Sequence, residues 1–597
     1  MLRKLLPIPF LQLWLWIILI VAFILRFWFI WDLDYSYDEL SAVLRAKQPN
    51  WNSHIQKGVI PDGHPALIQT IIWLVGDHVT VLKIFAALAG TISVYFIYLA
   101  GKNMFNTAAG IASAAFLSIQ YSGLFWSQQI RPYAFGLFFC TGLLWIFSQL
   151  VFAKQRNKKQ YLLLILFAVG AAYTHYFSGL FACPILLVLF WFEKNQIRHY
   201  AISIALIVVL FTPHFSVTLH QLQSAGLQWL GKPTPAFFIA HLYEIFNHSW
   251  LWFILIFIFI LNGFFASLKY KIPIPQKQII VAIILFLTPL FVGYFYSVTR
   301  SPVLQHSVLL FSMPPLMLIV GYFCSIIPMR IFHLQSMIVI SSGILLIVYG
   351  RKHYSVVSKE AYSSAVRYMV KDTQSVFLVD APKDIFEYYL EKYDPENKIH
   401  FEYLDFRNRA QFIQKISDFQ NNKIYPRFLL SSGSDPAIIP LLEELFNSKK
   451  CSHLETSWIG AEIPFFHYKG HNLKYFIIER FNLEYRYKPI DMHLYSLHPE
   501  QNDVVVVKYL KNTSDSISGE LQCNLRNGNT YIDWRSEKLR NDSGYLNELV
   551  ILPLKLADIP SWKPDSKLTI KLESAYQRGV LNVSLVKGNP YLYGVPD

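Results

Sequence analysis

Charged residues are scarce in this sequence. Only 15% of its 597 residues are charged and 54% are hydrophobic, whereas ordinary soluble domains carry about 25% charged residues. The shortage lies mostly before Gly350; after it, segments such as KDTQSVFLVDAPKD read as ordinary soluble sequence. Because the chain is too long for one domain, the change in composition predicts the main domain boundary there.

Several common motifs are absent as well. The sequence has no heptads, no internal repeats, no Gly-rich phosphate loop and no zinc-type spacing of Cys and His, so coiled-coil, solenoid, P-loop and zinc-finger classes are excluded. Of its five cysteines, only Cys451 and Cys523 lie in the soluble part, where a disulfide between them is one alternative. The net charge of +14 does not indicate nucleic acid, because basic residues of membrane proteins collect in cytoplasmic loops and at anionic headgroups.

Long apolar runs are what the sequence does have. A spanning helix needs about 20 mostly apolar residues, and eleven ranges meet this description: 9–31, 79–100, 105–125, 132–153, 160–177, 178–193, 199–217, 249–268, 278–298, 304–327 and 333–350. The weakest are the two beside Thr174-His175-Tyr176, where a re-entrant hairpin is the alternative. The first run lacks a cleavage site of the signal-peptide type, so we interpret it as a retained helix.

Basic residues in the short loops predict the orientation. With eleven spans they fall on one side, which the positive-inside rule makes cytoplasmic. They are Arg3, Lys4, Lys154, Arg156, Lys158, Lys159, Lys194, Arg198, Lys269, Lys271, Lys277 and Arg330. An odd number of spans then places residues 351–597 outside the cytoplasm.

The soluble region is predicted to have two parts. In residues 351–472, strand-like runs (VFLVD, RFLLSS) alternate with helical ones (DIFEYYLEKY, PLLEELFNS), which is typical of a small α/β domain. In residues 473–597, short alternating strands are separated by turn signals (KNTSDS, RNGNT, RNDSG), which predicts a β-sandwich.

Candidate catalytic residues begin just after the first span, in DLDYSYDEL. Asp38 and Glu39 open a predicted interfacial helix, ELSAVLRA. A carboxylate partly shielded at the bilayer surface can remove the proton of an acceptor hydroxyl as a general base. The alternative is that these acids only solvate a helix N-terminus, where negative charge is favoured.

Further polar residues share that outer face. They are His64 in GHPALIQ, Arg131 in SQQIRPYAFG, His175 and Tyr176 in YTHYFSG, and Arg300, Gln305 and His306 in VTRSPVLQHS. An arginine at this place can bind a phosphate through two N–H groups, although snorkelling to the interface is its alternative. His64 has a structural alternative too, because Pro65 suits a helix start without any function.

The combination fits a phosphorylated lipid donor that arrives from the bilayer. An ion path is disfavoured, because the middles of the spans contain almost no ionisable residues and a transporter keeps some there. A transporter or flippase for lipid-linked glycans, and a non-catalytic scaffold of envelope assembly, stay as alternative functions.

The order of these motifs resembles a known family. A DE pair after the first span, an HP-starting segment in the same loop, RPY at the fourth span and THY after the fifth resemble the bacterial GT-C glycosyltransferases, relatives of protein O-mannosyltransferases and of the aminoarabinose transferase of lipid A (glycosyltransferase family 39). The resemblance covers about residues 1–350, and the soluble region does not contribute to it.

The resemblance implies a reaction and roles for residues. A GT-C transmembrane catalytic domain would pass a sugar from a polyprenyl-phosphate carrier to a lipid, glycan or protein acceptor, with inversion. Asp38 would be the general base and Glu39 its support, while His64, His175 and Tyr176 would line the pocket. Arg131, Tyr133, Arg300 and His306 would contact the donor. No metal is required, although the carboxylates could bind a divalent cation. The resemblance also implies a multi-pass protein of the inner (plasma) membrane with a periplasmic C-terminal region.

Two departures from the family pattern stand out. Relatives often have an acidic residue just before RPY, where this chain has Gln128 and Gln129, and an Arg-Tyr pair where it has His306-Ser307. Arg300 or a protonated His306 could replace the missing cation. An altered donor and a degenerate enzyme are the other readings of these changes.

Overall fold

A computed structural model of the chain describes residues 8–192, 194–223, 232–358 and 361–403, and after residue 403 mainly the strands with a few residues beside them. The chain forms two compact units, residues 1–360 and 361–597. Their boundary lies close to the change in composition near Gly350. The division into domains at residues 350 and 472 stays a prediction.

The first unit is helical. Its helices are α1 (Ile8–Phe27), α2 (Tyr37–Ala46), α3 (Trp51–Ser53), α4 (Ile60–Asp62), α5 (Leu67–Val75), α6 (Val79–Met104), α7 (Thr107–Ser118), α8 (Tyr121–Trp126), α9 (Pro132–Val151), α10 (Lys158–Thr174), α11 (Tyr176–Phe192), α12 (Ile197–Phe211), α13 (Phe215–Gln223), α14 (Ala236–Ile245), α15 (Trp250–Lys269), α16 (Gln276–Thr299), α17 (Met313–Ser325), α18 (Met329–Leu345) and α19 (His353–Val357). Short 3-10 or π segments join some of them: η2 (Ile30–Asp32), η3 (His54–Val59), η4 (Lys194–Gln196), η5 (Thr212–His214), η6 (Ser307–Ser312) and η7 (Leu346–Gly350).

Eight helical stretches among the described residues are long and apolar enough to cross a membrane: Phe10–Asp32, Val79–Met104, Pro132–Val151, Ile197–Gln223, Trp250–Lys269, Gln276–Thr299, Ser307–Ser325 and Met329–Ser355. They coincide with eight of the eleven predicted spans. The other three fall on α7, α10 and α11, which have 12, 17 and 17 residues. A polytopic helical membrane domain is thereby confirmed, and the count of eleven spans stays a prediction.

Local sequence explains where several helices begin. Asn106, Asn157 and Ser249 precede α7, α10 and α15, and each side-chain oxygen accepts the backbone N–H three residues further on. Such caps satisfy one of the donors that a helix start leaves unpaired. Pro132 opens α9, a position where the missing N–H of proline costs nothing.

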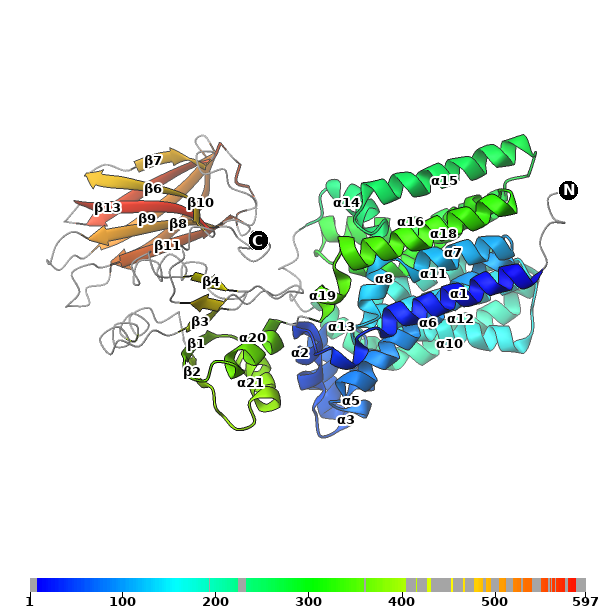
Figure 1. The fold of residues 1–597 in the computed structure, drawn as a ribbon, viewed down its shortest axis with the longest axis horizontal. Coiled ribbons are helices and arrows are strands. Elements are labelled where there is room, and N and C mark those ends of the chain that lie inside the picture. Colours follow the sequence, from blue (N-terminus) through cyan, green and yellow to red (C-terminus); the bar gives the residue numbers. More distant parts are fainter. Residues whose placement is uncertain are drawn as a thin grey trace. The chain divides into compact units, whose positions relative to one another are not determined.

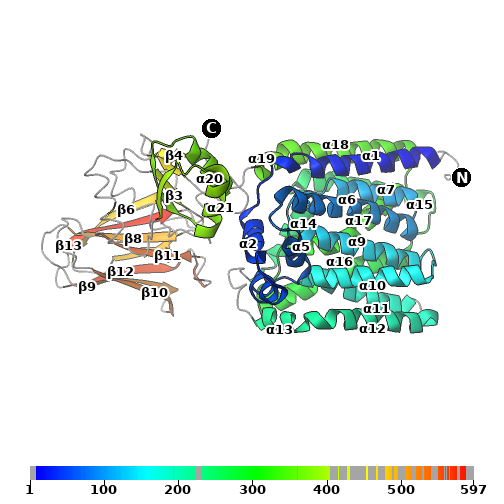
Figure 2. The ribbon, with the colours of Figure 1, turned by 90° about the horizontal axis from the view of Figure 1, so that it is seen from below.

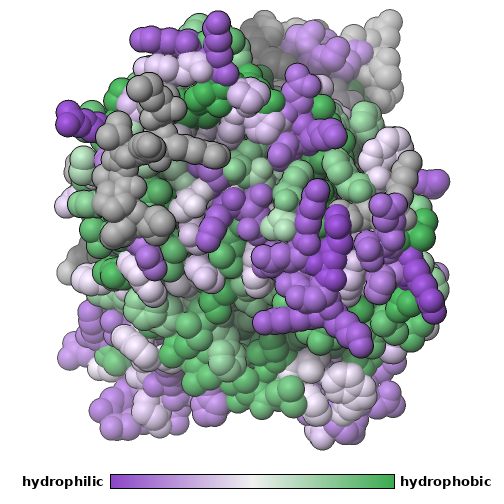
Figure 3. Space-filling view, turned by 90° about the vertical axis from the view of Figure 1, so that its right-hand side faces the viewer, coloured by the Kyte–Doolittle hydropathy of each residue, from purple (hydrophilic) through white to green (hydrophobic). Residues whose placement is uncertain are grey.

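Different helices lie at the two ends of the helix bundle. Figures 1 and 2 place α2, α5, α13, α14 and α19 together at one end and the start of α1 at the other. The end with the start of α1 faces the viewer in Figure 3, where hydrophilic side chains gather in a patch among apolar ones. Which end faces the cytoplasm stays a prediction.

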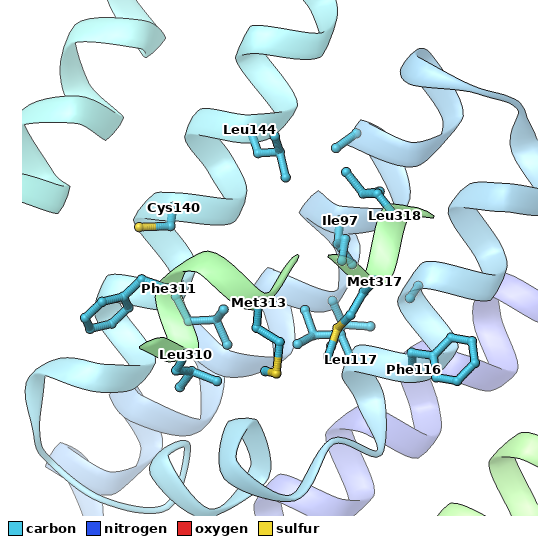
Figure 4. Close-up of a cluster of buried hydrophobic side chains, with 14 of the residues drawn as sticks. Ile97, Phe116, Leu117, Cys140, Leu144, Leu310, Phe311, Met313, Met317 and Leu318 are labelled. Carbon is cyan, nitrogen blue, oxygen red and sulfur yellow. The ribbon is translucent and has the colours of Figure 1, made fainter. Parts of the chain in front are cut away.

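The core of the bundle holds the central helices in close contact. Figure 4 shows Phe311 and Met313 packed with side chains of α6, α7, α9 and α17 in one buried cluster. Gly101 of α6 and Gly110 of α7 let their helices approach, since a Cβ at Gly101 would lie 2.8 Å from the Gly110 Cα. Helices in lipid associate through such close packing of small residues, because burial from water is not available to them.

The second unit begins with a mixed five-stranded sheet of order β2-β1-β3-β5-β4. Strand β1 (Val376–Asp380) runs parallel to β2 (His400–Tyr403) and β3 (Arg427–Leu430), and β5 (Phe465–His467) pairs antiparallel with β3 and with β4 (Ser452–Leu454). Helix α20 (Ala361–Val370) precedes β1, and α21 (Lys383–Tyr393) forms the crossover that a parallel pair requires. The predicted helix PLLEELFNS and Cys451 lie outside the described residues.

The remaining strands form two four-stranded antiparallel sheets, ordered β10-β9-β12-β7 and β11-β8-β13-β6. The strands are β6 (Ile477–Arg486), β7 (Ile490–His493), β8 (Val504–Lys511), β9 (Gly519–Asn527), β10 (Thr530–Leu539), β11 (Leu549–Lys555), β12 (Lys567–Ser574) and β13 (Arg578–Val586). Buried residues of both sheets, such as Val507 and Leu521, belong to one hydrophobic cluster. The sandwich arrangement of the sheets stays a prediction.

Candidate active site

Asp38 and Glu39 stand in the first turn of α2 but have opposite surroundings. The helix begins with a capping box: the Ser36 hydroxyl accepts the N–H of Glu39, and the Glu39 carboxylate accepts the N–H of Ser36 at 2.7 Å. Glu39 is completely buried, whereas Asp38 is exposed. The pair therefore divides into a buried anchor and an outward carboxylate.

Glu39 is held by a buried lysine. The Lys83 ammonium donates to both Glu39 oxygens, at 2.9 and 3.0 Å, and to the carbonyl of Gln128 at 3.0 Å. Oε1 of Glu39 also accepts the backbone N–H of Ile130 at 2.6 Å. A buried ion pair is tolerated when hydrogen bonds satisfy its remaining groups, which is the case here. The contacts tie α2 and α6 to residues 128–130, next to Arg131.

Gln128 and Gln129, which the family resemblance sets apart as departures, also hold the junction between α2, α6 and residues 128–130. The Gln128 amide donates to the carbonyls of Arg26 and Trp28, and its oxygen lies 2.9 Å from His353 Nε2. The Gln129 oxygen accepts the Ser36 hydroxyl at 3.0 Å. Both side chains thus connect parts of the chain that surround the start of α2.

A buried arginine of α1, Arg26, also holds this junction. The Arg26 guanidinium donates to the carbonyls of Leu117 and Ser118, and to the Ser127 hydroxyl at 3.3 Å. Gly90 leaves room for this contact, because a Cβ there would lie 1.9 Å from the Ser127 oxygen. The segment that leads to Arg131 is therefore fixed to α1, α6 and α7.

Arg131 turns its guanidinium towards the first predicted external loop. Its Nη1 lies 3.3 Å from Oδ1 of Asp62 and 3.4 Å from the backbone oxygen of Asp38. Asp62 ends α4 with its side chain 3% exposed, and it also binds Arg45 at 2.6 Å and Nδ1 of His64 at 3.0 Å. One buried carboxylate is thus shared by two guanidinium groups and an imidazole.

The charges in this cluster support one another. Burial alone would raise the pKa of Asp62, but Arg131, His64 and Arg45 outweigh it and hold the pKa well below its usual value. Burial likewise disfavours the charged form of Arg131, yet Asp62 and Asp38 raise its pKa overall. Asp38 therefore lies in the field of a partly buried cation that stays charged.

Aromatic rings line the space next to Arg131. The His175 ring lies 5.1 Å from that of His64 and 5.8 Å from that of Tyr133, centre to centre. Phe311 of η6 packs against His175 at 5.2 Å, and the Tyr133 side chain is hydrogen-bonded to Ser307. The structure thus brings together three of the predicted pocket and donor residues, from three separate segments.

Tyr176 points elsewhere. Its hydroxyl is hydrogen-bonded to the Gln221 side chain of α13, whose amide donates to the carbonyls of Val59 at 2.8 Å and His64 at 2.9 Å. The nearby His214 accepts the N–H of Ala66 at 3.1 Å. Tyr176 therefore braces the loop that carries Asp62 and His64.

His306 belongs to a second polar cluster. Its Nδ1 lies 3.3 Å from Nδ1 of His241, and its ring stacks on Phe237 with centres 4.4 Å apart. Glu244, one turn after His241, pairs with His248 at 2.8 Å. Burial lowers the pKa of His306, which works against the protonated ring expected as a substitute cation. Ser307 connects this cluster to Tyr133.

Arg300 is separate from both clusters. It follows α16 as an exposed residue, and its side chain has no hydrogen bond or ion pair within the described part of the chain. Arg300 therefore does not contact the other predicted site residues, and its donor role stays a prediction.

Sequence reasoning missed two residues of the site, Asp62 and Lys83. Lys83 is the one charged residue in the predicted span 79–100, and a lone charge within a span usually marks a specific partner. Asp62 stands two residues before His64 in the same loop, and its proximity to the HP segment was the available signal. Within the described residues, no group of three or more His, Cys, Asp or Glu could hold a metal ion.

Fold and site together define a polytopic membrane protein with a charged, partly buried site at one end of its helices. Residues 61–216 match the family of dolichyl-phosphate-mannose-protein mannosyltransferases. This segment carries a domain of that family, which confirms the resemblance to GT-C glycosyltransferases. It contains Asp62, His64, Arg131, Tyr133 and His175, while Asp38 precedes it.

Solved structures give a more distant likeness. ArnT from Cupriavidus metallidurans bound to undecaprenyl phosphate is 10% identical with a TM-score of 0.43, and its apo form is 11% identical with a TM-score of 0.41. Each comparison covers 76% of this chain and 98% of the other. No curated protein matches the sequence.

Proposed function

We propose that this chain is an integral membrane glycosyltransferase that moves a sugar from a polyprenyl-phosphate carrier to an acceptor outside the cytoplasm, with inversion. One observation carries the proposal: an exposed carboxylate, Asp38, stands near the partly buried cation Arg131, whose Nη1 lies 3.4 Å from the Asp38 backbone oxygen. A base next to a fixed cation is what transfer from a phosphate leaving group needs.

The chemistry follows from these two groups. Asp38 takes the proton of the acceptor hydroxyl while that oxygen attacks the anomeric carbon of the sugar. The bond between this carbon and the phosphate oxygen breaks, and its electron pair leaves with the polyprenyl phosphate. Attack opposite to the leaving group inverts the carbon. Arg131 stabilises the negative charge that develops on the phosphate.

The other predicted residues take supporting parts. Glu39, with no acceptor left over, holds the start of α2 and hence Asp38. His64, Tyr133 and His175 form the wall next to Arg131, and Tyr176 supports it through Gln221. His306 adjoins Ser307, the hydrogen-bond partner of Tyr133, and Arg300 stays a predicted donor contact.

The kind of donor is supported by the family domain. The family matched by residues 61–216 is named for dolichyl-phosphate-mannose, a sugar on a lipid phosphate. The predicted place of the protein is the inner membrane, with the C-terminal region periplasmic, where a lipid-linked sugar and an envelope acceptor would meet.

The test measures transfer of a radiolabelled sugar from polyprenyl phosphate to an envelope fraction. Asp38→Asn should lower the rate by about 10²–10⁴-fold because the general base is lost. Arg131→Ala should also lower the rate, by a larger factor than it lowers the amount of protein inserted in the membrane. Asp32→Asn, which alters another exposed acid of the same loop, is the matched control. Full activity of both site variants would refute the assignment.

A further inference from the structure

The two ring nitrogens of His64 have different surroundings. Nδ1 lies 2.9 Å from the backbone oxygen of Asp62 and 3.0 Å from its Oδ2. Both neighbours only accept hydrogen bonds, so Nδ1 must carry a hydrogen. Nε2 has no hydrogen-bond partner among the described residues, and the side chain is 18% exposed. Nε2 is therefore the nitrogen that a substrate can reach.

Asp62 fixes this ring next to Arg131. Its Oδ1 binds Arg131 and Arg45, while Oδ2 binds His64. A carboxylate on one imidazole nitrogen sets the ring's orientation and makes the other nitrogen more basic. The His64 backbone is held as well, because its carbonyl accepts the Gln221 amide at 2.9 Å. The ring is thus oriented from two directions.

We propose that His64 is the proton donor to the leaving polyprenyl phosphate, with Asp62 as its positioning residue. This role rests on the proposed function and adds a second catalytic group to it. Asp38 receives the proton of the acceptor hydroxyl, and His64 Nε2 gives its proton to a phosphate oxygen as the sugar–oxygen bond breaks.

The protons balance over one turnover. The acceptor loses one proton and the phosphate gains one; Asp38 then releases its proton to water, and His64 takes one back. The second pKa of a phosphate monoester is about 6, close to the unperturbed value of about 6.5 for histidine. Transfer between groups of matched pKa is efficient, so an imidazole suits this leaving group.

Several charged groups act on the His64 ring. Asp62 contacts it directly, Arg131 and Arg45 bind the same carboxylate, and the His175 ring lies 5.1 Å away, centre to centre. A ring that donates a proton must carry that proton at the start of each turnover. Activity should therefore fall on the alkaline side.

Two substitutions separate proton donation from bracing of the loop. His64→Asn keeps a donor at the position of Nδ1, towards Asp62, and loses the outward nitrogen; His64→Gln keeps an outward N–H that cannot ionise. Both should lower kcat/KM by about 10²–10³-fold and remove the alkaline limb of its pH profile. His78→Gln, an exposed histidine of the same loop, should change neither. Wild-type rates in His64→Asn, or an alkaline limb that persists in His64→Gln, would overturn the proposal.

Asp62→Asn tests the positioning role. The neutral amide no longer stabilises the imidazolium, so the alkaline limb should move to lower pH while the limb itself remains. An unmoved limb would remove Asp62 from the proposal.

Binding of polyprenyl phosphate keeps this proposal separate from the proposed function. Wild-type protein should bind this product more tightly at pH 6 than at pH 8, by a larger factor than His64→Asn does, because the protonated ring contributes only in the wild type. Equal factors would refute the role of His64 even where Asp38 proves essential. Full transfer by Asp38→Asn would refute the proposed function, and the binding result would still decide whether His64 meets the phosphate.

Discussion

Glu39 and Asp62 are two buried carboxylates of the first predicted external loop, and their partners differ. Glu39 has one cation, Lys83, and both side chains are at most 1% exposed; backbone N–H groups fill its other acceptor positions. Asp62 has three basic partners, Arg45, His64 and Arg131, whose side chains are 31%, 18% and 11% exposed. We call the first the Glu39–Lys83 pair and the second the Asp62 cluster.

The difference separates structural from chemical use of buried charge. In the Glu39–Lys83 pair the charges cancel, and the hydrogen bonds leave no acceptor for a substrate. In the Asp62 cluster, three basic side chains surround one carboxylate. These side chains are partly exposed, so that they can attract an anion. The pair should therefore control stability, and the cluster activity.

Lys83→Met should have the largest effect on stability. It leaves Glu39 buried without a cation, and breaking such a pair costs about 3–5 kcal/mol. The measurement is thermal unfolding of the detergent-solubilised protein. Lys102→Met, an exposed lysine near the other end of α6, is the control and should cost little.

The double variant Glu39→Gln with Lys83→Met sharpens this result. Removing both charges together should recover part of the loss, because no uncompensated charge stays buried. Additive losses, or a Lys83→Met variant as stable as Lys102→Met, would mean that the Glu39–Lys83 pair is not what holds the junction.

Glu244 is a third carboxylate, intermediate between the two. It has one basic partner, His248 at 2.8 Å, a hydrogen bond from the Ser122 hydroxyl, and 18% exposure. Burial works to raise its pKa, but the contacts with His248 and Ser122 outweigh it and lower the pKa to about 2. Its ionised form is therefore favoured by folding.

The sign of the pH effect follows from this lowered pKa. Glu244 stabilises the folded protein fully above its unfolded pKa near 4.5, and the contribution, about 3 kcal/mol, is lost as pH falls from there towards 2. The free energy of unfolding should therefore differ less between pH 7 and pH 3 in Glu244→Gln than in the wild type. An equal difference in both would contradict the pairing.

The helices could be predicted from sequence because the bilayer dictates their length. Spanning segments need about 20 apolar residues, with every backbone group bonded internally, and the predicted ranges 79–100 and 132–153 accordingly coincide with α6 and α9. Two residues of the site could also be predicted, because Asp38 and Arg131 are polar residues beside spans on one predicted face.

The contacts between these residues could not be predicted. Asp62 and Arg131 are 69 positions apart, and Glu39 and Lys83 are 44 apart; their meeting depends on how the loop folds over the helix ends. The sequence alone presents Gln128 as a departure from the family, whereas its amide joins the end of α1 to His353. A sequence pattern gives residue types, but not which backbone carbonyls a side chain will bind.

The Lys47–Asp77 pair gives the smallest expected effect and sets the baseline for the comparison. Its nitrogen and oxygen lie 3.0 Å apart, like those of the buried pair, but the side chains are 50% and 26% exposed. Water and salt screen such pairs, so Asp77→Asn should cost at most about 1 kcal/mol, and less at high ionic strength. Sugar transfer should not change. A loss as large as that of Lys83→Met would show that distance, rather than burial, decides what these ion pairs contribute.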